Sequence, residues 1–256
     1  MISLLEAVRP YIYLFKGIRI STRPDCIDHD VLELLKKYGV TSIELGAQSL
    51  NDDVLVANDR GHSSSDVYTA SSLIRQFGFE LGLQMMTGLY RSTVESDFET
   101  AKRIVDIKPD TVRIYPTVIM KNTKLHKLYV EGEYIPQTLD EAVSLGADLL
   151  KLFIENDISV IRLGLHSSDS LTTDMVAGPY HPSFRELCES KILFDKLFLK
   201  MKENNIQGEC EVLVSPSCVS KLVGNKKSNI KKFDELGYKI KITQNTDVKE
   251  MDVVLK

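Results

Sequence analysis

Short runs of alternating apolar and polar residues recur along the first two thirds of the chain, and longer amphipathic stretches separate them. The alternating runs predict β-strands at 17–21, 41–47, 80–86, 111–115 and 159–165. In the stretches between them, apolar residues return at i, i+3 and i+4, which predicts helices. Strands that alternate with helices are typical of right-handed βαβ units, so we expect an α/β fold with a parallel sheet.

One face of these predicted strands is polar, which is unusual for a parallel sheet, because parallel strands commonly read as unbroken apolar runs. The apolar face consists of Ile18, Ile20, Ile43, Leu45, Leu81, Leu83, Met85, Val112, Ile114, Ile161, Leu163 and Leu165. The polar face consists of Arg19, Ser21, Glu44, Gly46, Gln48, Gly82, Gln84, Arg113, Tyr115, Arg162, Gly164 and His166. This polar face predicts a cavity for a polar ligand; the alternative is an antiparallel sheet with one solvated face.

The pattern changes after His166. Residues 166–188 show no clear period and predict a long loop across the cavity, and residues 189–205 predict a helix. The sequence of residues 206–256 predicts one strand, two helices and two further strands. We therefore divide the chain into three parts: 1–165, 166–205 and 206–256.

The composition is that of a globular protein. The chain has 256 residues, of which 43% are hydrophobic and 27% are charged. It contains no run of about 18 apolar residues and no signal-like start, so we expect a cytoplasmic protein without a membrane span. Its four cysteines stand far apart and form no CxxC pair, so we expect no metal site from this chain.

The net charge of −4 is unevenly distributed. Residues 1–190 carry 19 Lys and Arg against 27 Asp and Glu, whereas residues 191–256 carry 13 against 9. A basic end behind an acidic body indicates two modules with different partners.

Four stretches together resemble the radical S-adenosylmethionine (SAM) enzymes related to the elongator catalytic subunit: 20–28, 43–62, 113–134 and 178–193. The second stretch is the most specific. In it an LGxQS turn ends a predicted strand, and an Arg-Gly-His triplet begins twelve residues after Gln48. The same Gln-to-Arg spacing occurs in oxygen-independent coproporphyrinogen oxidases, a related branch. The resemblance covers residues 1–205.

The resemblance implies a partial (β/α)₆ barrel with parallel strands, of which this chain forms the C-terminal part. In that family a CxxxCxxC loop after the first strand holds a [4Fe–4S] cluster, and a glycine-rich motif after the second strand contacts SAM. This sequence contains neither motif. We therefore expect 17–21 to be the third barrel strand of an N-terminally truncated enzyme. The full-length enzyme would use SAM and the cluster, whereas we expect this chain alone to bind neither tightly and to be inactive.

The resemblance also implies site residues. Gln48 and Arg60 match the residues that contact the methionyl carboxylate of SAM, for which a guanidinium fork is well suited. Ser21 and Gln84 occupy positions that are polar in relatives, although relatives often carry Glu and Asp there. Four polar-face residues are candidates for the substrate end of the cavity, or alternatively make structural hydrogen bonds: Arg113, Tyr115, Arg162 and His166.

The basic end resembles a KH-type nucleic-acid-binding module over residues 219–233. Such modules carry a GxxG loop between two helices, and its backbone approaches phosphates. Gly224 matches the first glycine of that loop, whereas Lys227 replaces the second. The predicted nucleic-acid-binding residues are Lys221, Gly224, Lys226, Lys227 and Lys231. The alternative is a solvated basic helix with no partner.

Taken together, the sequence predicts part of a radical SAM enzyme. In an intact relative, reductive cleavage of SAM yields a 5′-deoxyadenosyl radical that abstracts a hydrogen atom from the substrate. The elongator resemblance favours transfer RNA or another RNA as substrate, without acetyl transfer, because no acetyltransferase region follows residue 205. Two alternatives stay open: a porphyrinogen-oxidase-like enzyme acting on a small tetrapyrrole, and a non-catalytic RNA-binding adaptor.

Overall fold

The computed structural model describes residues 2–256, with every side chain in that range except that of Ser170. The larger part of the molecule is a parallel sheet with the strand order β1-β2-β3-β4-β6. Its strands are β1 (Ile18–Thr22), β2 (Val40–Gln48), β3 (Glu80–Thr87), β4 (Thr111–Pro116) and β6 (Ser159–Leu163). These bounds differ from the predicted ones by one or two residues, and the predicted parallel α/β fold is confirmed.

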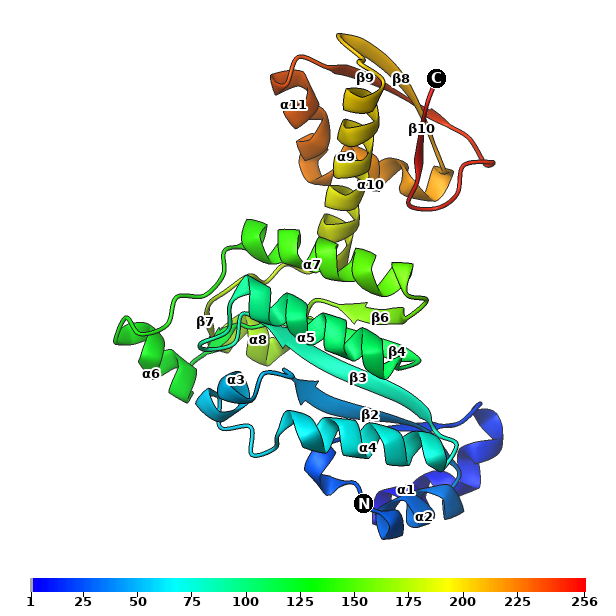
Figure 1. Cartoon of the computed structure of the whole chain (residues 1–256), viewed down its shortest axis with the longest axis vertical. Helices are drawn as coiled ribbons and strands as arrows, with labels where there is room; N and C mark the ends of the chain where they lie inside the picture. Colours follow the sequence, from blue (N-terminus) through cyan, green and yellow to red (C-terminus); the bar gives the residue numbers. More distant parts are fainter. Residues whose placement is uncertain (1) are drawn as a thin grey trace.

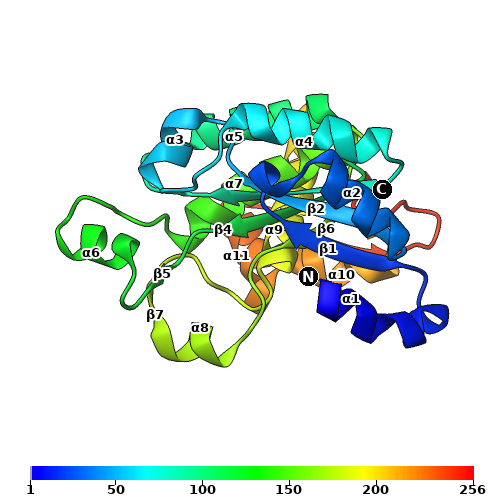
Figure 2. The ribbon, with the colours of Figure 1, turned by 90° about the horizontal axis from the view of Figure 1, so that it is seen from below.

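Helices cover one face of this sheet (Figures 1 and 2). They are α2 (His29–Lys37), α4 (Ser64–Gln76), α5 (Val94–Ile107) and α7 (Leu139–Glu155). The last three begin with capping boxes, which satisfy backbone N–H groups that have no partner within the helix. Because a helix follows its strand directly, helix N-termini and strand carboxyl ends share one edge of the sheet. None of the helices between residues 2 and 256 is long and apolar enough to cross a membrane.

The predicted apolar face packs under these helices, except for Ile161 and Leu165, of which Leu165 is only half-buried and lies beyond the end of β6. Ile43, Leu83 and Ile114 are almost fully buried, as predicted. Ile161 is 40% exposed, so the prediction that it packs in the core is wrong. The register explains the error: Val112 pairs with Val160, but the next pair is Arg113 with Arg162, so Ile161 is skipped by a bulge.

Short elements surround the carboxyl edge of the sheet. They are α3 (Asp52–Ala57), α6 (Lys124–Val130), α8 (Asp169–Asp174) and an antiparallel pair of β5 (Ile119–Met120) with β7 (Met175–Ala177). The prediction of an unstructured loop over 166–188 is therefore wrong. A helix of six residues and a strand of three are too short to show a hydrophobic period.

A single long helix joins this body to a second, smaller core (Figure 1). Helix α9 (Phe184–Glu203) begins five residues earlier than predicted. Its first half packs on the main sheet through Phe184 and Cys188, and its second half packs in the small core through Leu197 and Met201.

The small core contains a three-stranded sheet in the order β10-β8-β9. Its elements are β8 (Glu209–Val214), α10 (Val219–Val223), α11 (Ser228–Glu235), β9 (Lys239–Gln244) and β10 (Val253–Leu255). This order of one strand, two helices and two strands agrees with the sequence. The division at 165 and 205 stays a prediction.

Candidate functional site

The carboxyl end of β2 carries the side chain of Gln48. This residue is 5% exposed and has φ of 63°, and the register of β2 against β3 shifts between Leu45 and Gln48. The Nε2 atom of Gln84, on β3, donates a hydrogen bond of 3.3 Å to Gln48 Oε1. A Cβ atom on Gly46 would lie 2.8 Å from Gln48 Nε2, so glycine leaves room for this side chain. The two glutamines therefore lie together at the carboxyl edge of the sheet.

Arg60 lies on the loop after α3, and this loop is fixed to the ends of two strands. The Nε2 atom of His62 lies 3.1 Å from the carbonyl oxygen of Ala47, near the end of β2. Arg23, just beyond β1, donates a hydrogen bond of 3.1 Å to the carbonyl oxygen of Gly61. These two contacts place Arg60 beside the carboxyl ends of β1 and β2.

The guanidinium of Arg60 is half-buried, and its Nε atom is buried and has no hydrogen-bond partner among the described residues. Burial, together with repulsion from Arg23, lowers the pKa of Arg60 from its usual value. A hollow of about 390 Å³ adjoins this side chain. A cation that is partly desolvated and unpaired favours an anionic ligand, since the ligand would compensate the charge.

A buried carboxylate organises the polar face of the sheet. Glu44 is 2% exposed, and its Oε2 atom lies 2.8 Å from Arg113 Nε and 3.9 Å from Arg19. Ser21 donates a hydrogen bond of 3.2 Å to the other oxygen of Glu44. Arg113 also donates to the hydroxyl of Tyr115 at 3.4 Å, and these contacts with Tyr115 and Glu44 raise the pKa of Arg113. Sequence reasoning placed Glu44 on this face but missed its role as the shared partner.

Arg162 and His166 differ in their relation to this face. Arg162 is the register partner of Arg113, and its Nε atom donates a hydrogen bond of 3.0 Å to the carbonyl oxygen of Gly164. His166 is exposed and lies beyond the end of β6. The structure therefore brings Arg113, Tyr115 and Arg162 together and leaves His166 apart.

The loop between α10 and α11 has an unusual backbone. Gly224, Lys226 and Lys227 have φ of 80°, 51° and 62°. A Cβ atom on Gly224 would lie 2.5 Å from Ser228 Oγ and 2.9 Å from Asn229 N, so glycine is required there. Left-handed conformations are uncommon for lysine, and two in succession mark a loop whose shape is imposed by its surroundings.

The lysines of this unit differ in their contacts. Lys221 lies 2.8 Å from Glu189 of α9, which also lies 2.8 Å from Arg185, so Lys221 attaches the loop region to α9. Within residues 2–256, no carboxylate forms an ion pair with Lys226 or Lys227. A hollow of about 550 Å³ lies between this loop, α9 and the start of α7, and we call it the lysine-lined hollow. Its basic residues include Lys191, Lys226 and Lys232.

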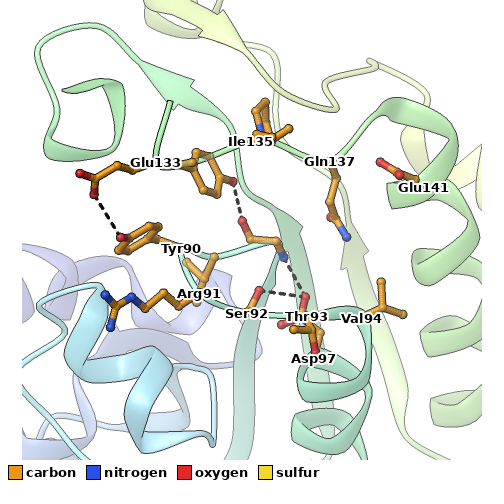
Figure 3. Close-up of a pocket in the computed structure, with 14 residues that line it drawn as sticks. Tyr90, Arg91, Ser92, Thr93, Val94, Asp97, Glu133, Ile135, Gln137 and Glu141 are labelled. Atoms are coloured by element: carbon orange, nitrogen blue, oxygen red, sulfur yellow. Dashed lines mark hydrogen bonds between the residues drawn. The ribbon is translucent and has the colours of Figure 1, made fainter. Parts of the chain in front are cut away.

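A separate cavity of about 580 Å³ was not predicted from the sequence (Figure 3). It lies between the turn after β3 and the segment before α7. The Tyr134 hydroxyl donates a hydrogen bond of 2.6 Å to the Gly88 carbonyl oxygen, and Gly88 N donates one of 2.8 Å to Asp97. Burial raises the pKa of Asp97 to about 6. Asn58 links this turn to the Arg60 loop by a hydrogen bond of 2.9 Å to the Tyr90 carbonyl oxygen.

Sequence comparison identifies the fold family. The profile of the Radical SAM superfamily matches residues 3–104, and that of the Radical SAM C-terminal domain matches residues 109–193. The chain belongs to the radical SAM superfamily. The predicted family is thereby confirmed, and the polar face lies on a partial radical SAM barrel.

Relatives of this radical SAM chain include two curated proteins. The tRNA uridine(34) acetyltransferase of Methanocaldococcus infernus is 35% identical over 130 residues, which are 49% of this chain and 24% of that protein. Elongator complex protein 3 of Saccharomyces cerevisiae is 34% identical over 139 residues, or 53% of this chain and 25% of that protein. The chain spans about a quarter of the length of these two relatives.

The solved structure of the archaeal Methanocaldococcus infernus Elp3, with an N-terminal deletion, is similar to this radical SAM chain. It superposes with a TM-score of 0.60 and 26% identity, and the match covers 75% of this chain and 42% of that one. The superposition extends the similarity beyond the segment aligned by sequence.

The cysteines of this radical SAM chain are dispersed. Cys26 is exposed, whereas Cys188, Cys210 and Cys218 are buried. Burial raises the pKa of the Cys188 and Cys210 thiols, which disfavours the thiolate that binds iron. Among the described residues, no group of three His, Cys, Asp or Glu side chains is arranged to hold a metal ion. The described side chains of residues 2–256 therefore do not fit a [4Fe–4S] cluster.

Proposed function

We propose that this chain forms the SAM-carboxylate side and the substrate cavity of a radical SAM enzyme that acts on RNA, with transfer RNA as the favoured substrate. Membership of the superfamily supports the radical SAM part of this proposal. One relative is a tRNA uridine(34) acetyltransferase, which supports an RNA substrate.

The observation that carries the SAM assignment is the unpaired guanidinium of Arg60. Its buried Nε atom has no hydrogen-bond partner, and it lies at the carboxyl edge of a parallel sheet, where ligands of such sheets bind. A methionyl carboxylate would satisfy Arg60. Gln48 is fixed at the same edge by Gln84, so its amide is oriented before any ligand arrives.

Ser21 takes a different part in this proposal. It donates its hydroxyl to Glu44, so it orients the buried carboxylate and through it Arg113. Its direct contact with SAM, implied by the resemblance, stays a prediction.

The described side chains do not fit a [4Fe–4S] cluster. In a radical SAM enzyme, SAM and a [4Fe–4S] cluster would together supply the radical chemistry. We assign the cluster ligands to residues outside this sequence. The residues of this chain bind and orient the organic ligands and exclude water from them.

The arginines of the polar face support an acidic substrate group. Arg19 and Arg113 contact the Glu44 carboxylate, whereas Arg162 forms no ion pair within the described residues. An unpaired guanidinium beside that pair fits a phosphate of the substrate. His166 is exposed and free to reach a large ligand at the mouth of the barrel.

The basic unit supports RNA binding. Lys226 and Lys227 lie on a loop with a left-handed backbone and form no ion pair with the described carboxylates, and Lys231 follows on α11. Phosphate neutralisation by such lysines supplies affinity without sequence specificity. The ion pair of Lys221 with Glu189 attaches the helix before this loop to α9.

The SAM assignment can be tested by NMR on the whole chain. We expect millimolar SAM to shift the Nε–H resonance of Arg60, whereas methylthioadenosine, which lacks the methionyl carboxylate, leaves it unchanged. SAM should also shift the side-chain amide resonances of Gln48, and Arg60→Gln should abolish these shifts. No response to SAM, or an equal response to methylthioadenosine, would contradict the assignment.

A further inference from the structure

The cavity of Figure 3 lies apart from the polar face and has the features of a preformed ligand site. Its volume of about 580 Å³ suits a ligand the size of a nucleotide. Its two walls are the turn at 88–94 and the segment at 133–137, and the hydrogen bond from Tyr134 to Gly88 fixes one wall to the other. The shape therefore exists before a ligand binds.

Three carboxylates line the cavity, those of Asp97, Glu133 and Glu141, against one cation, Arg91. The Gln137 side chain makes no hydrogen bond within residues 2–256, and its Oε1 atom is buried. Asp97 is 2% exposed and accepts hydrogen bonds from Gly88 N at 2.8 Å and Ser92 Oγ at 3.4 Å through one oxygen, Oδ2. The carboxylate of Glu133 lies 3.5 Å from the Tyr90 hydroxyl. A lining rich in acceptors requires a ligand that brings donors.

The ring of Tyr90 and the guanidinium of Arg91 lie on the side of the cavity opposite Gln137 (Figure 3). The ring of Tyr90 is half-exposed, and Arg91 places its guanidinium carbon 5.5 Å from the ring centroid. Arg91 has φ of 62°, and it forms no ion pair with a carboxylate within the described part of the chain. A stacking surface next to an unpaired guanidinium suits a planar base that carries a phosphate.

The cavity and the lysine-lined hollow lie on two sides of the N-terminal end of α7. Gln137 and Glu141 line the cavity, whereas Asp140 and Val143 line the hollow. An α-helix with its side chains is about 10–12 Å across, so one nucleic-acid strand that crosses the start of α7 can reach both sites.

Resting on the RNA substrate proposed above, we propose that this cavity binds one nucleobase of single-stranded RNA whose phosphates lie against the lysine-lined hollow. Gln137 and Asp97 accept hydrogen bonds from the two N–H groups of the exocyclic amino group of the base, and the Tyr90 ring stacks on the base. The pocket therefore prefers cytosine to uracil, because uracil carries a carbonyl oxygen where cytosine carries the amino group.

The test compares binding of oligo(C) and oligo(U) decamers to the full chain at low salt, since the two bases differ only in the group on C4 and in the proton on the adjacent N3. We expect oligo(C) to bind about tenfold more tightly, which corresponds to one good base contact. Gln137→Leu and Tyr90→Ala should each remove the preference. Two controls should preserve it: Val130→Ser, at a residue of α6 that is 72% exposed and does not line the cavity, and Tyr90→Phe, which keeps the ring.

The outcomes separate this inference from the RNA proposal. If both decamers bind equally, or if the preference survives Gln137→Leu and Tyr90→Ala, the base pocket is overturned while RNA binding stands. If cytidine monophosphate binds as tightly as oligo(C), the pocket holds a free nucleotide and the assignment to RNA is overturned. If neither decamer binds, both proposals fall. Lys226→Glu should weaken both decamers alike and leave their ratio unchanged.

Discussion

Arg113 Nε lies 2.8 Å from Glu44 Oε2, and the two residues stand on strands that are not neighbours. Strand β3 lies between them, and Gly82 of β3 is the register partner of Glu44. A Cβ atom on Gly82 would lie 3.3 Å from the Glu44 side chain, so glycine gives this carboxylate the space to reach across β3. One ion pair thereby ties three strands of the polar face together.

The first prediction concerns this ion pair. Glu44→Gln leaves the Arg113 and Arg19 guanidinium groups without their buried counter-charge, so we expect a loss of about 3 kcal/mol in the free energy of unfolding. Glu80→Gln is the matched control, because Glu80 is 40% exposed and pairs with the same Arg19 at 2.6 Å. It should cost less than about 1 kcal/mol. Urea unfolding measures both, and equal losses would contradict the account.

The second prediction concerns the pH dependence of stability. Burial raises the pKa of Asp97 from 3.8 to about 6, so the folded state holds its proton more tightly than the unfolded state does. This stabilisation is complete below the unfolded pKa and is lost as pH rises through about 6, which amounts to about 2 kcal/mol between pH 4 and pH 7.

Asp97→Asn tests this, because the amide oxygen can still accept from Gly88 N and carries no charge. We expect the variant to lack this pH dependence and to be the more stable protein at pH 8 in urea unfolding. Asp106→Asn, at an exposed position of the same helix, should follow the wild type. A wild-type slope in the Asp97 variant would show that another group is responsible.

The third prediction concerns iron. Because the cysteines of this chain are dispersed and mostly buried, anaerobic reconstitution with iron and sulfide should give no stoichiometric cluster and no 5′-deoxyadenosine from SAM. Iron analysis and chromatography of the products measure this. Four irons per chain together with 5′-deoxyadenosine would sink the assignment of the cluster ligands to other residues.

The sequence predicted the strands because each has one apolar and one polar face, so the alternation is visible in every strand. It failed at Ile161, since a bulge shifts the phase of a strand without changing its composition. It also missed α8 and β7, which each span fewer than two hydrophobic periods. Arg60 and Gln48 were predicted through the family resemblance. The structure adds that the Nε atom of Arg60 is buried and has no hydrogen-bond partner among the described residues.

The cavity of Figure 3 was missed for a different reason. Its walls come from two segments about forty residues apart, and neither segment carries a motif of its own. The raised pKa of Asp97 arises from burial, which a sequence pattern does not reveal. The ion pair of Lys221 with Glu189 likewise joins two elements that the sequence treats as independent.

The most direct test of the central claim is RNA binding by the whole chain as a function of salt. We predict that Lys226→Glu with Lys227→Glu weakens binding about tenfold for all sequences alike and makes the log–log salt dependence shallower by about 1.4. The control, Lys239→Glu with Lys241→Glu, makes an equal change in net charge on β9 and should weaken RNA binding less than about threefold. Binding that is absent at low salt, or indifferent to the loop substitution, would contradict an RNA-directed function.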